Sequence, residues 1–234
     1  MKLSELKKVI QRQADPQRAK SCLWFFKTGK GEYGEGDKFL GIAVPEQRKI
    51  AKQFFADTSL SDLQKLIQSK FHEERLIALL IAVLKFERAN EVERKEIYNF
   101  YLKHTKYINN WDLVDLSAPK IVGAYLFNKN TDILEDLAKS KNLWERRIAT
   151  ISTFYFIGQG RYKDSLVIAK ILINDKHDLI QKAVGWMLRE VGKRCGEDIE
   201  ENFLKQHYKT MPRTALRYAI ERFSESKRRF YLAK

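Results

Sequence analysis

The stretch His72–Phe86, HEERLIALLIAVLKF, decides the fold class. Behind a charged start, its apolar residues recur with the 3.6-residue period of an α-helix. Stretches of the same kind follow at Trp111–Leu126, Leu143–Ile157, Leu179–Val191 and Pro212–Phe223. Their starts lie 32 to 39 residues apart, a spacing that indicates an array of repeated helical units.

A second amphipathic stretch precedes each of these five, at Ser61–Gln68, Glu91–Leu102, Asp132–Ala138, Tyr162–Asn174 and Glu197–His207. A two-helix unit of this length is typical of HEAT or armadillo arrays. We therefore predict an all-α protein, an α-solenoid of HEAT-like two-helix repeats that forms a single domain over residues 1–234 without a linker. The second helices of such stacks line a concave wall, which we expect to form a basic cradle for a rod-like partner.

The composition agrees with a helical fold. The 234 residues are 44% hydrophobic and include only four prolines and eleven glycines, which argues against general disorder and against an all-β chain. No apolar window is long enough to span a bilayer, and the first eight residues lack the apolar stretch of a secretion signal. We expect a cytoplasmic protein. Cys22 and Cys195 lie far apart without metal-ligand company, which predicts buried, reduced thiols and no metal site.

The net charge indicates a polyanionic partner. Lys and Arg number 44 against 30 Asp and Glu, giving +14 at pH 7 and a pI of about 9.6. Such an excess attracts polyanions, of which nucleic acid is the commonest partner of a basic protein. On charge alone, a merely basic surface stays an alternative.

Residues 27–38 break the helical pattern, because they hold four of the eleven glycines in a short charged run. No phosphate-binding G-x-x-x-x-G-K-[ST] pattern is present. We predict an exposed, mobile loop that flanks DNA and not a nucleotide site.

Trp111 and Asp115 lie four residues apart in one predicted helix, so they share a face. In a basic protein the carboxylate is held ionised, and the indole supplies an apolar or cation-stabilising wall. The alternative is that Trp111 belongs to the core and Asp115 to an ion pair. Asp112, in the first turn, is expected to serve the helix dipole.

Two further tryptophans occupy corresponding places in later units. Trp186 shares a predicted helix with Lys182 and Arg189, a basic and aromatic stripe that suits a DNA backbone. Trp144 stands at a helix start and is expected to pack between repeats.

Other polar residues give weaker signals. Arg146 and Arg147 are adjacent, so their side chains point in different directions from the helix and only one of them faces the cradle. The planar guanidinium of that residue is suited to binding phosphate. The histidines show no spacing for a metal or a catalytic triad, so we expect them to be solvated or partly buried; they are His72, His104, His177 and His207.

Four segments, in order and at compatible spacing, resemble the AlkD-type DNA alkylation repair glycosylases over nearly the whole chain: Phe39–Arg48, Trp111–Asp115, Leu143–Arg147 and Ile180–Glu190. These relatives are HEAT-like proteins that act on bulky or cationic purine lesions. The resemblance implies that Asp115 is the catalytic aspartate, that Trp111 and Trp186 contact the lesion nucleotide, and that Arg147 holds the DNA backbone.

The chain departs from the family near residues 25–38. Where the family has an aromatic residue, often Tyr, beside the site, this chain has Phe25 and Phe26 followed by the glycine-rich insertion. The full set of predicted DNA contacts is Phe25, Arg48, Arg147, Lys182, Arg189 and Arg213.

The resemblance implies a monofunctional glycosylase that excises N3-methyladenine and N7-methylguanine from duplex DNA. Such a base is already a good leaving group, and Asp115 stabilises the oxocarbenium-like sugar; neither a metal nor an organic cofactor is required. The resemblance also implies that the lesion stays largely stacked. We expect a monomer. Two alternatives stay open: a non-catalytic HEAT-repeat protein that binds damaged or branched DNA, and a protein-binding scaffold.

Overall fold

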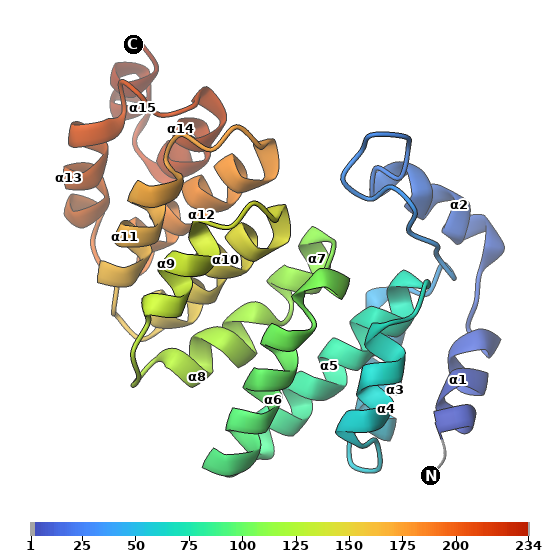
Figure 1. Cartoon of the computed structure of the whole chain (residues 1–234). Helices are drawn as coiled ribbons and strands as arrows, with labels where there is room; N and C mark the ends of the chain where they lie inside the picture. Colours follow the sequence, from blue (N-terminus) through green and yellow to red (C-terminus); the bar gives the residue numbers. More distant parts are fainter. Residues whose placement is uncertain (1–2, 234) are drawn as a thin grey trace. The chain divides into compact units, whose positions relative to one another are not determined.

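The computed structural model describes residues 3–233, which form a succession of helices (Figure 1). Within that range no strand is present, and the only β-type pairing is an isolated bridge between Lys38 and Phe71. The all-α prediction is therefore confirmed. The chain divides after Ile121 into two compact units, and the expectation of a single domain stays a prediction.

The N-terminal unit holds the first seven α-helices of the described chain: α1 (Leu3–Arg12), α2 (Pro16–Phe25), α3 (Val44–Phe54), α4 (Leu60–Ile67), α5 (His72–Arg88), α6 (Glu91–Lys103) and α7 (Trp111–Asp115). A 3₁₀ turn, Thr105–Tyr107, precedes α7. Helix α5 is the centre of this unit, since it packs against α3, α4 and α6 and buries most of its residues. The decisive stretch of the sequence is thus the core helix around which the unit is built.

The C-terminal unit holds α8 (Ala124–Leu126), α9 (Asp132–Ala138), α10 (Leu143–Gly158), α11 (Lys163–Leu172), α12 (Asp178–Arg194), α13 (Glu197–His207), α14 (Arg213–Ala219), a 3₁₀ turn (Ile220–Arg222) and α15 (Glu225–Leu232). Helix α12 packs against α10, α11, α13 and α14. Gly185 allows the close approach to α14, because a Cβ there would lie 2.3 Å from the carbonyl oxygen of Ala215.

The predicted apolar stretches at His72, Leu143 and Leu179 correspond to α5, α10 and α12. The prediction of one continuous helix over Trp111–Leu126 was wrong. Helix α7 ends at Asp115, and the chain reaches α8 through a π-helical turn, Pro119–Gly123. Proline lacks a backbone N–H, so Pro119 cannot donate the helical hydrogen bond to the carbonyl of Asp115, which accounts for the interruption.

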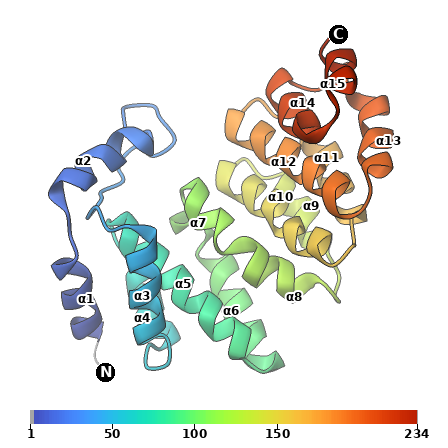
Figure 2. The same ribbon diagram turned by 180° about the vertical axis from the view of Figure 1, so that it is seen from behind.

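Helix α2 differs from the others of its unit because it buries none of its residues. Asp15 caps its start by accepting hydrogen bonds from two backbone N–H groups of the first turn. Its last residues include three exposed apolar side chains, Leu23, Trp24 and Phe25. The ribbon of α2 stands apart from those of α3 and α4 (Figure 2), and the residue before the helix is tied to the rest of the unit by a hydrogen bond of 2.8 Å from the N–H of Asp15 to the carbonyl of Leu40.

Cys22 and Cys195 are free thiols, and both are half-buried, so the prediction that they are buried was wrong. Cys22 lies on α2, which buries no residue, and Cys195 caps the end of α12. Among residues 3–233 no helix is both long and apolar enough to cross a membrane.

Candidate active site

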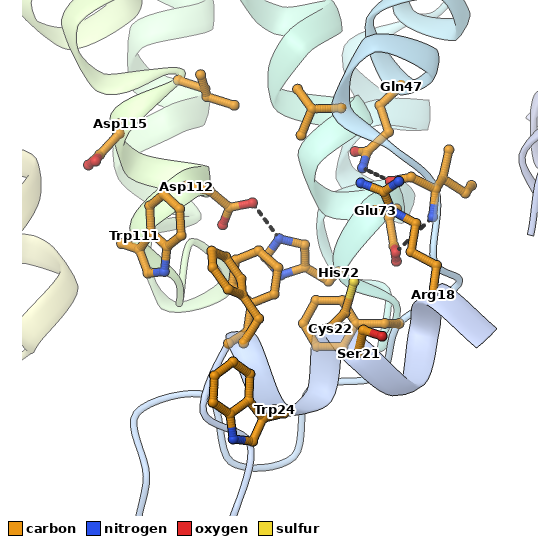
Figure 3. Close-up of a pocket in the computed structure, with 16 residues that line it drawn as sticks. Arg18, Ser21, Cys22, Trp24, Gln47, His72, Glu73, Trp111, Asp112 and Asp115 are labelled. Carbon is orange, nitrogen blue, oxygen red and sulfur yellow. Dashed lines mark hydrogen bonds and ion pairs between the residues drawn. The ribbon is translucent and has the colours of Figure 1, made fainter. Parts of the chain in front are cut away.

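A cavity of about 630 Å³ opens in the N-terminal unit, between α2 on one side and the first turns of α3, α5 and α7 on the other (Figure 3). Helix α7 contributes Trp111, Asp112 and Asp115 to its wall. The two residues that the sequence placed on one helical face, Trp111 and Asp115, therefore line the same cavity.

Aromatic rings form much of the cavity wall. The ring of Phe26 stacks on Trp111, with centroids 5.6 Å apart and planes 28° from parallel, and on Phe39 at 5.0 Å and 13°. Phe25 meets Trp111 edge-on at 5.9 Å and is 54% exposed at the rim, next to Trp24, which is 76% exposed. The cavity therefore presents flat apolar surfaces near its opening.

A buried imidazole lies beneath these rings. Nε2 of His72 is 2.8 Å from Oδ2 of Asp112, and Nδ1 is 3.4 Å from Oδ2 of Asp37. Arg75 and Asn109 donate hydrogen bonds to the other oxygen of Asp37, at 2.7 and 3.0 Å. Burial disfavours the charged ring, but the two carboxylates outweigh it and raise the pKa of His72 to about 9. At neutral pH the site is thus built on an imidazolium between two carboxylates.

The expectation that the histidines are solvated or partly buried was wrong for His72 and His104, which are 2% and 4% exposed. His104 makes a hydrogen bond of 2.7 Å to the carbonyl of Phe100. Asp112 does lie in the first turn of α7, but its Oδ2 atom is bound to His72 and so does more than balance the helix dipole. The contact between His72 and Asp112 could not be predicted from a local sequence pattern, because the two residues come from distant segments.

Glu73 fixes the segment that follows the glycine-rich loop. Its carboxylate accepts backbone N–H hydrogen bonds from Leu40, Gly41 and Ile42, at 2.9, 2.7 and 3.3 Å. Gly41 has a φ of +84°, and a Cβ there would lie 2.1 Å from the carbonyl oxygen of Asp15. Only glycine fits this backbone, which explains the Phe39–Arg48 motif in structural terms.

The glycine-rich run of residues 27–38 is mostly exposed, as predicted. The backbone N–H of Gly34 returns to the carbonyl of Lys27 at 3.0 Å and closes the loop. Its far end is anchored by buried Asp37, whose pKa is lowered because hydrogen bonding to His72 and the charge of Arg75 outweigh the effect of burial. The loop thus ends in the charged network under the cavity.

The lining of the cavity includes a buried polar side chain, Gln47. Gln47 is 2% exposed, and its Nε2 atom donates a hydrogen bond of 2.7 Å to the carbonyl of Ile42. Its Oε1 atom has no hydrogen-bond partner among the residues that the structure describes. The residues that line the cavity therefore include a buried amide oxygen whose hydrogen-bonding capacity is not used within the described chain.

Asp115 also borders a second hollow, of about 310 Å³, in the same unit. Arg48 and Lys52, one turn apart on α3, line it together with Lys120 of the π-helical turn. Lys120 lies 3.8 Å from a carboxylate oxygen of Glu87. The Asp115 carboxylate thus stands between an aromatic cavity and a hollow with three cations, of which only Arg48 was predicted from the sequence.

The predicted stripe on α12 lies in the C-terminal unit. Trp186 is half-buried, and its ring centroid is 5.7 Å from that of Phe154. Lys182 pairs with Asp178 of the same helix at 2.6 Å. Arg189 pairs with two carboxylates, Glu190 at 3.8 Å and Glu221. Both cations are therefore neutralised locally in the absence of a partner.

The remaining predicted DNA contacts occupy different environments. Arg147 is 5% exposed, and its Nη1 atom donates to the carbonyl of Leu179 at 2.6 Å, which joins α10 to the start of α12. Arg213 is exposed and donates to the carbonyl of Leu232 at 2.7 Å. Trp144 is buried, as expected of a packing residue. The DNA contact of Arg147 stays a prediction.

These observations define a helical-repeat protein with a carboxylate set between an aromatic cavity and a cluster of basic side chains. A family model described as DNA alkylation repair enzyme matches residues 6–223, which is most of the chain. The protein belongs to this DNA alkylation repair enzyme family.

Solved structures show the same fold. A predicted DNA alkylation repair enzyme from Enterococcus faecalis is 20% identical, with a TM-score of 0.69 over 91% of this chain and 98% of that one. AlkD2 from Streptococcus mutans is 18% identical, with a TM-score of 0.57 over 89% and 98%. The smu.31 protein of Streptococcus mutans UA159 is 20% identical, with a TM-score of 0.57 over 78% and 93%. These likenesses support the HEAT-like arrangement of the helices. No match was found among curated proteins.

Proposed function

We propose that the protein is a monofunctional DNA glycosylase that excises cationic alkylated purines, of the N3-methyladenine and N7-methylguanine type, from duplex DNA. Membership of the DNA alkylation repair enzyme family supports alkylated DNA as the substrate. The observation that carries the proposal is the position of Asp115, a carboxylate that borders both the aromatic cavity and the hollow lined by Arg48, Lys52 and Lys120.

The chemistry requires little beyond electrostatics. Alkylation at N3 or N7 makes the purine cationic, so the bond between C1′ and the base breaks with its electron pair passing to the base. Positive charge then develops on the deoxyribose, where the carboxylate of Asp115 stabilises it, an effect typically worth a few kcal/mol. Water adds its oxygen to C1′ and loses a proton to Asp115 or to solvent, which completes the hydrolysis.

The surrounding side chains bind and orient the DNA. Trp111 forms an apolar wall beside the reacting sugar and excludes competing water. Arg48, Lys52 and Lys120 attract phosphates through their charge. The Trp186, Lys182 and Arg189 stripe of the C-terminal unit is proposed to hold the DNA further along, once phosphates displace its internal carboxylate partners. A metal or organic cofactor is not needed for these steps, and we propose that the protein acts as a monomer in the cytoplasm.

The test is release of N7-methylguanine from methylated duplex DNA at fixed salt by the native protein and by Asp115→Asn, after both are shown to be folded. We expect native release and at least a tenfold drop in the variant, or about 1.4 kcal/mol of transition-state stabilisation. Asp136→Asn, an exposed carboxylate on α9, is the matched control and should retain the native rate.

A failure of this test has a clear meaning. If neither the native protein nor the variant releases the base while both bind DNA, the result supports the alternative of a non-catalytic protein that binds damaged or branched DNA. If binding is weak and insensitive to salt, the scaffold alternative gains support, because phosphate contacts require a steep salt dependence.

A further inference from the structure

The basic stripe of α12 borders α14, and a glycine brings the two helices close together. A Cβ at Gly185 would lie 2.5 Å from the Cβ atom of Tyr218. Four residues further along α12, Arg189 forms an ion pair with Glu221, which lies in the 3₁₀ turn that follows α14. Helices α12 and α14 therefore run side by side (Figure 1), and Glu221 lies at the edge of the stripe that is proposed to bind DNA.

The two carboxylates that pair with Arg189 differ in their surroundings. Glu190 is buried and also pairs with Arg194 at 2.9 Å, so its charge is shared between two arginines. The side chain of Glu221 is 58% exposed, and it meets Arg189 at the surface. Glu221 is therefore the carboxylate that an incoming ligand can replace, whereas Glu190 stays in place.

A carboxylate and a phosphate offer a guanidinium the same kind of partner, namely a pair of negatively charged oxygens. Arg189 can therefore pair either with Glu221 or with a DNA phosphate through the same N–H groups. A phosphate has to displace Glu221, and the displaced carboxylate then lies beside a second anion, which adds repulsion. Both effects oppose the binding of DNA at this position.

The other cation of the stripe has a partner of a different kind. Lys182 pairs with Asp178, one turn earlier on the same helix, at 2.6 Å. Asp178 also lies in the first turn of α12, where a carboxylate stabilises the helix dipole. Glu221 instead reaches a cation on another helix. The pair between Arg189 and Glu221 is thus set by the packing of α14 on α12 and not by helical spacing.

The neighbours of Glu221 in the chain favour a nucleic-acid backbone. Arg217 precedes it by one helical turn and Arg222 follows it, and both are exposed. Tyr218 is an exposed aromatic residue of the same segment. Cations and hydroxyl groups of this kind are the usual phosphate contacts of DNA-binding proteins. Glu221 is the residue of this group whose charge opposes such contacts.

We propose that Glu221 occupies the phosphate position on Arg189 in the free protein and so lowers the affinity of the C-terminal unit for duplex DNA. The inference rests on the proposed binding of DNA by the stripe of α12 and adds a residue that weakens it. Because phosphate contacts carry no sequence information, Glu221 weakens the hold on undamaged duplex, which a repair enzyme must leave in order to search further.

The first experiment measures affinity for an undamaged duplex by fluorescence anisotropy at a fixed low salt concentration. Glu221→Gln keeps the shape of the side chain and removes its charge, so we expect binding at least about threefold tighter than native. Glu225→Gln is the matched control, because Glu225 is also exposed and pairs with an arginine, Arg229, at 2.7 Å. Its affinity should stay close to that of the native protein.

The second experiment tests whether the effect depends on Arg189. Arg189→Gln alone should weaken duplex binding, and adding Glu221→Gln to it should bring no more gain than Glu225→Gln does. The melting temperature of Glu221→Gln should stay within about 3 °C of native, because an ion pair with an exposed carboxylate contributes little to stability. A merely structural pair would instead change the melting temperature and leave the affinity unchanged.

The inference fails if Glu221→Gln binds the duplex no more tightly than the native protein, or if its gain persists without Arg189. Either result, with N7-methylguanine still released by the native protein, leaves the proposed glycosylase function standing. If the native protein releases no base while the affinities change as expected, the glycosylase function is overturned and the role of Glu221 holds for a protein that only binds DNA. Absence of duplex binding by the native protein and by every variant would overturn both.

Discussion

The Nε2 atom of His72 lies 2.8 Å from Oδ2 of Asp112, the residue that follows Trp111 at the start of α7. This bond joins the first residue of the core helix α5 to the short helix that carries the proposed catalytic carboxylate. The same imidazole stacks under Phe26 at 4.9 Å, and Phe26 stacks on Trp111. The packing of Trp111 is therefore linked through Phe26 to the buried imidazole of His72.

Stability should fall as pH rises above neutrality. The pKa of His72 is raised from 6.5 in the unfolded chain to about 9 in the folded protein, so its contribution is fully present below pH 6.5 and is lost as the pH approaches 9. The loss is on the order of a few kcal/mol. Urea denaturation at pH 6, 7.5 and 9 measures it.

The His72→Gln variant separates this effect from other titrations. It should be less stable than the native protein at pH 6, because it leaves Asp37 and Asp112 without a buried cation. The difference in the free energy of unfolding between the two proteins should shrink toward pH 9. A difference that stays constant from pH 6 to pH 9 would contradict the raised pKa of His72.

The salt dependence of DNA affinity should show whether the cations of the hollow beside Asp115 contact phosphates. Each of Arg48→Gln, Lys52→Gln and Lys120→Gln should weaken duplex binding and lower the slope of log affinity against log salt by roughly 0.9. Fluorescence anisotropy over a range of salt concentrations provides the slopes. Lys95→Gln, an exposed cation on α6, serves as the control. Equal slopes for all four variants and the native protein would exclude these cations as phosphate contacts.

Local rules were enough to predict much of the fold. Helices α9 and α13 begin and end where the pattern predicted, since each has a charged first turn and a regular apolar stripe. The shared face of Trp111 and Asp115 followed from their spacing, and both residues line one cavity, whereas the stripe on α12 stays a prediction. Lys52 could also have been found, because it lies one helical turn after Arg48.

The buried network could not be predicted in this way. Asp37, His72 and Asp112 come from three segments that no helical period relates, and their contact depends on how α5, α7 and the glycine-rich loop pack. Helix α2 was missed for a related reason. It buries no residue, so it has no apolar stripe that faces a core, and it forms because Asp15 caps it and Pro16 starts it.

Gly41→Ala should destabilise the N-terminal unit. Its φ of +84° is unfavourable for alanine, and the new Cβ would lie 2.1 Å from the backbone oxygen of Asp15, so the loop held by Glu73 must shift. We expect a loss of at least 1 to 3 kcal/mol, about the cost of a strained backbone alone, measured by urea denaturation. Gly158→Ala is the control, since a Cβ at that helical position meets nothing within 4 Å and should leave stability equal or higher. Similar losses for both variants would refute the steric explanation.

Glu200→Gln should stabilise the protein at neutral and alkaline pH. Burial, with help from the nearby charge of Glu197, raises the pKa of Glu200 from 4.5 to about 9. Its contribution is therefore most favourable below pH 4.5 and is lost progressively as the pH rises toward 9. At pH 8 the free energy of unfolding of the variant should exceed that of the native protein by on the order of a few kcal/mol. Melting temperatures measured across this pH range should change less with pH in the variant than in the native protein.

The matched change Glu96→Gln, on the exposed side of α6, should alter neither the stability nor its pH profile. A Glu200→Gln protein that is less stable than native at pH 8 would show that the charged form of Glu200 is accommodated in the core.

Helix α2 and the part of the cavity wall opposite it differ in how well they tolerate substitutions. The wall opposite α2 is constrained by Glu73, His72 and Gly41, where almost any replacement disturbs several hydrogen bonds or the backbone. The facing helix contributes nothing to the core, so its inward side chains can be exchanged at little cost in free energy. The N-terminal unit thus combines a helix that tolerates replacement with a fixed polar network, so a library restricted to residues 18–25 would change the lining of the cavity without disturbing the network that holds α7.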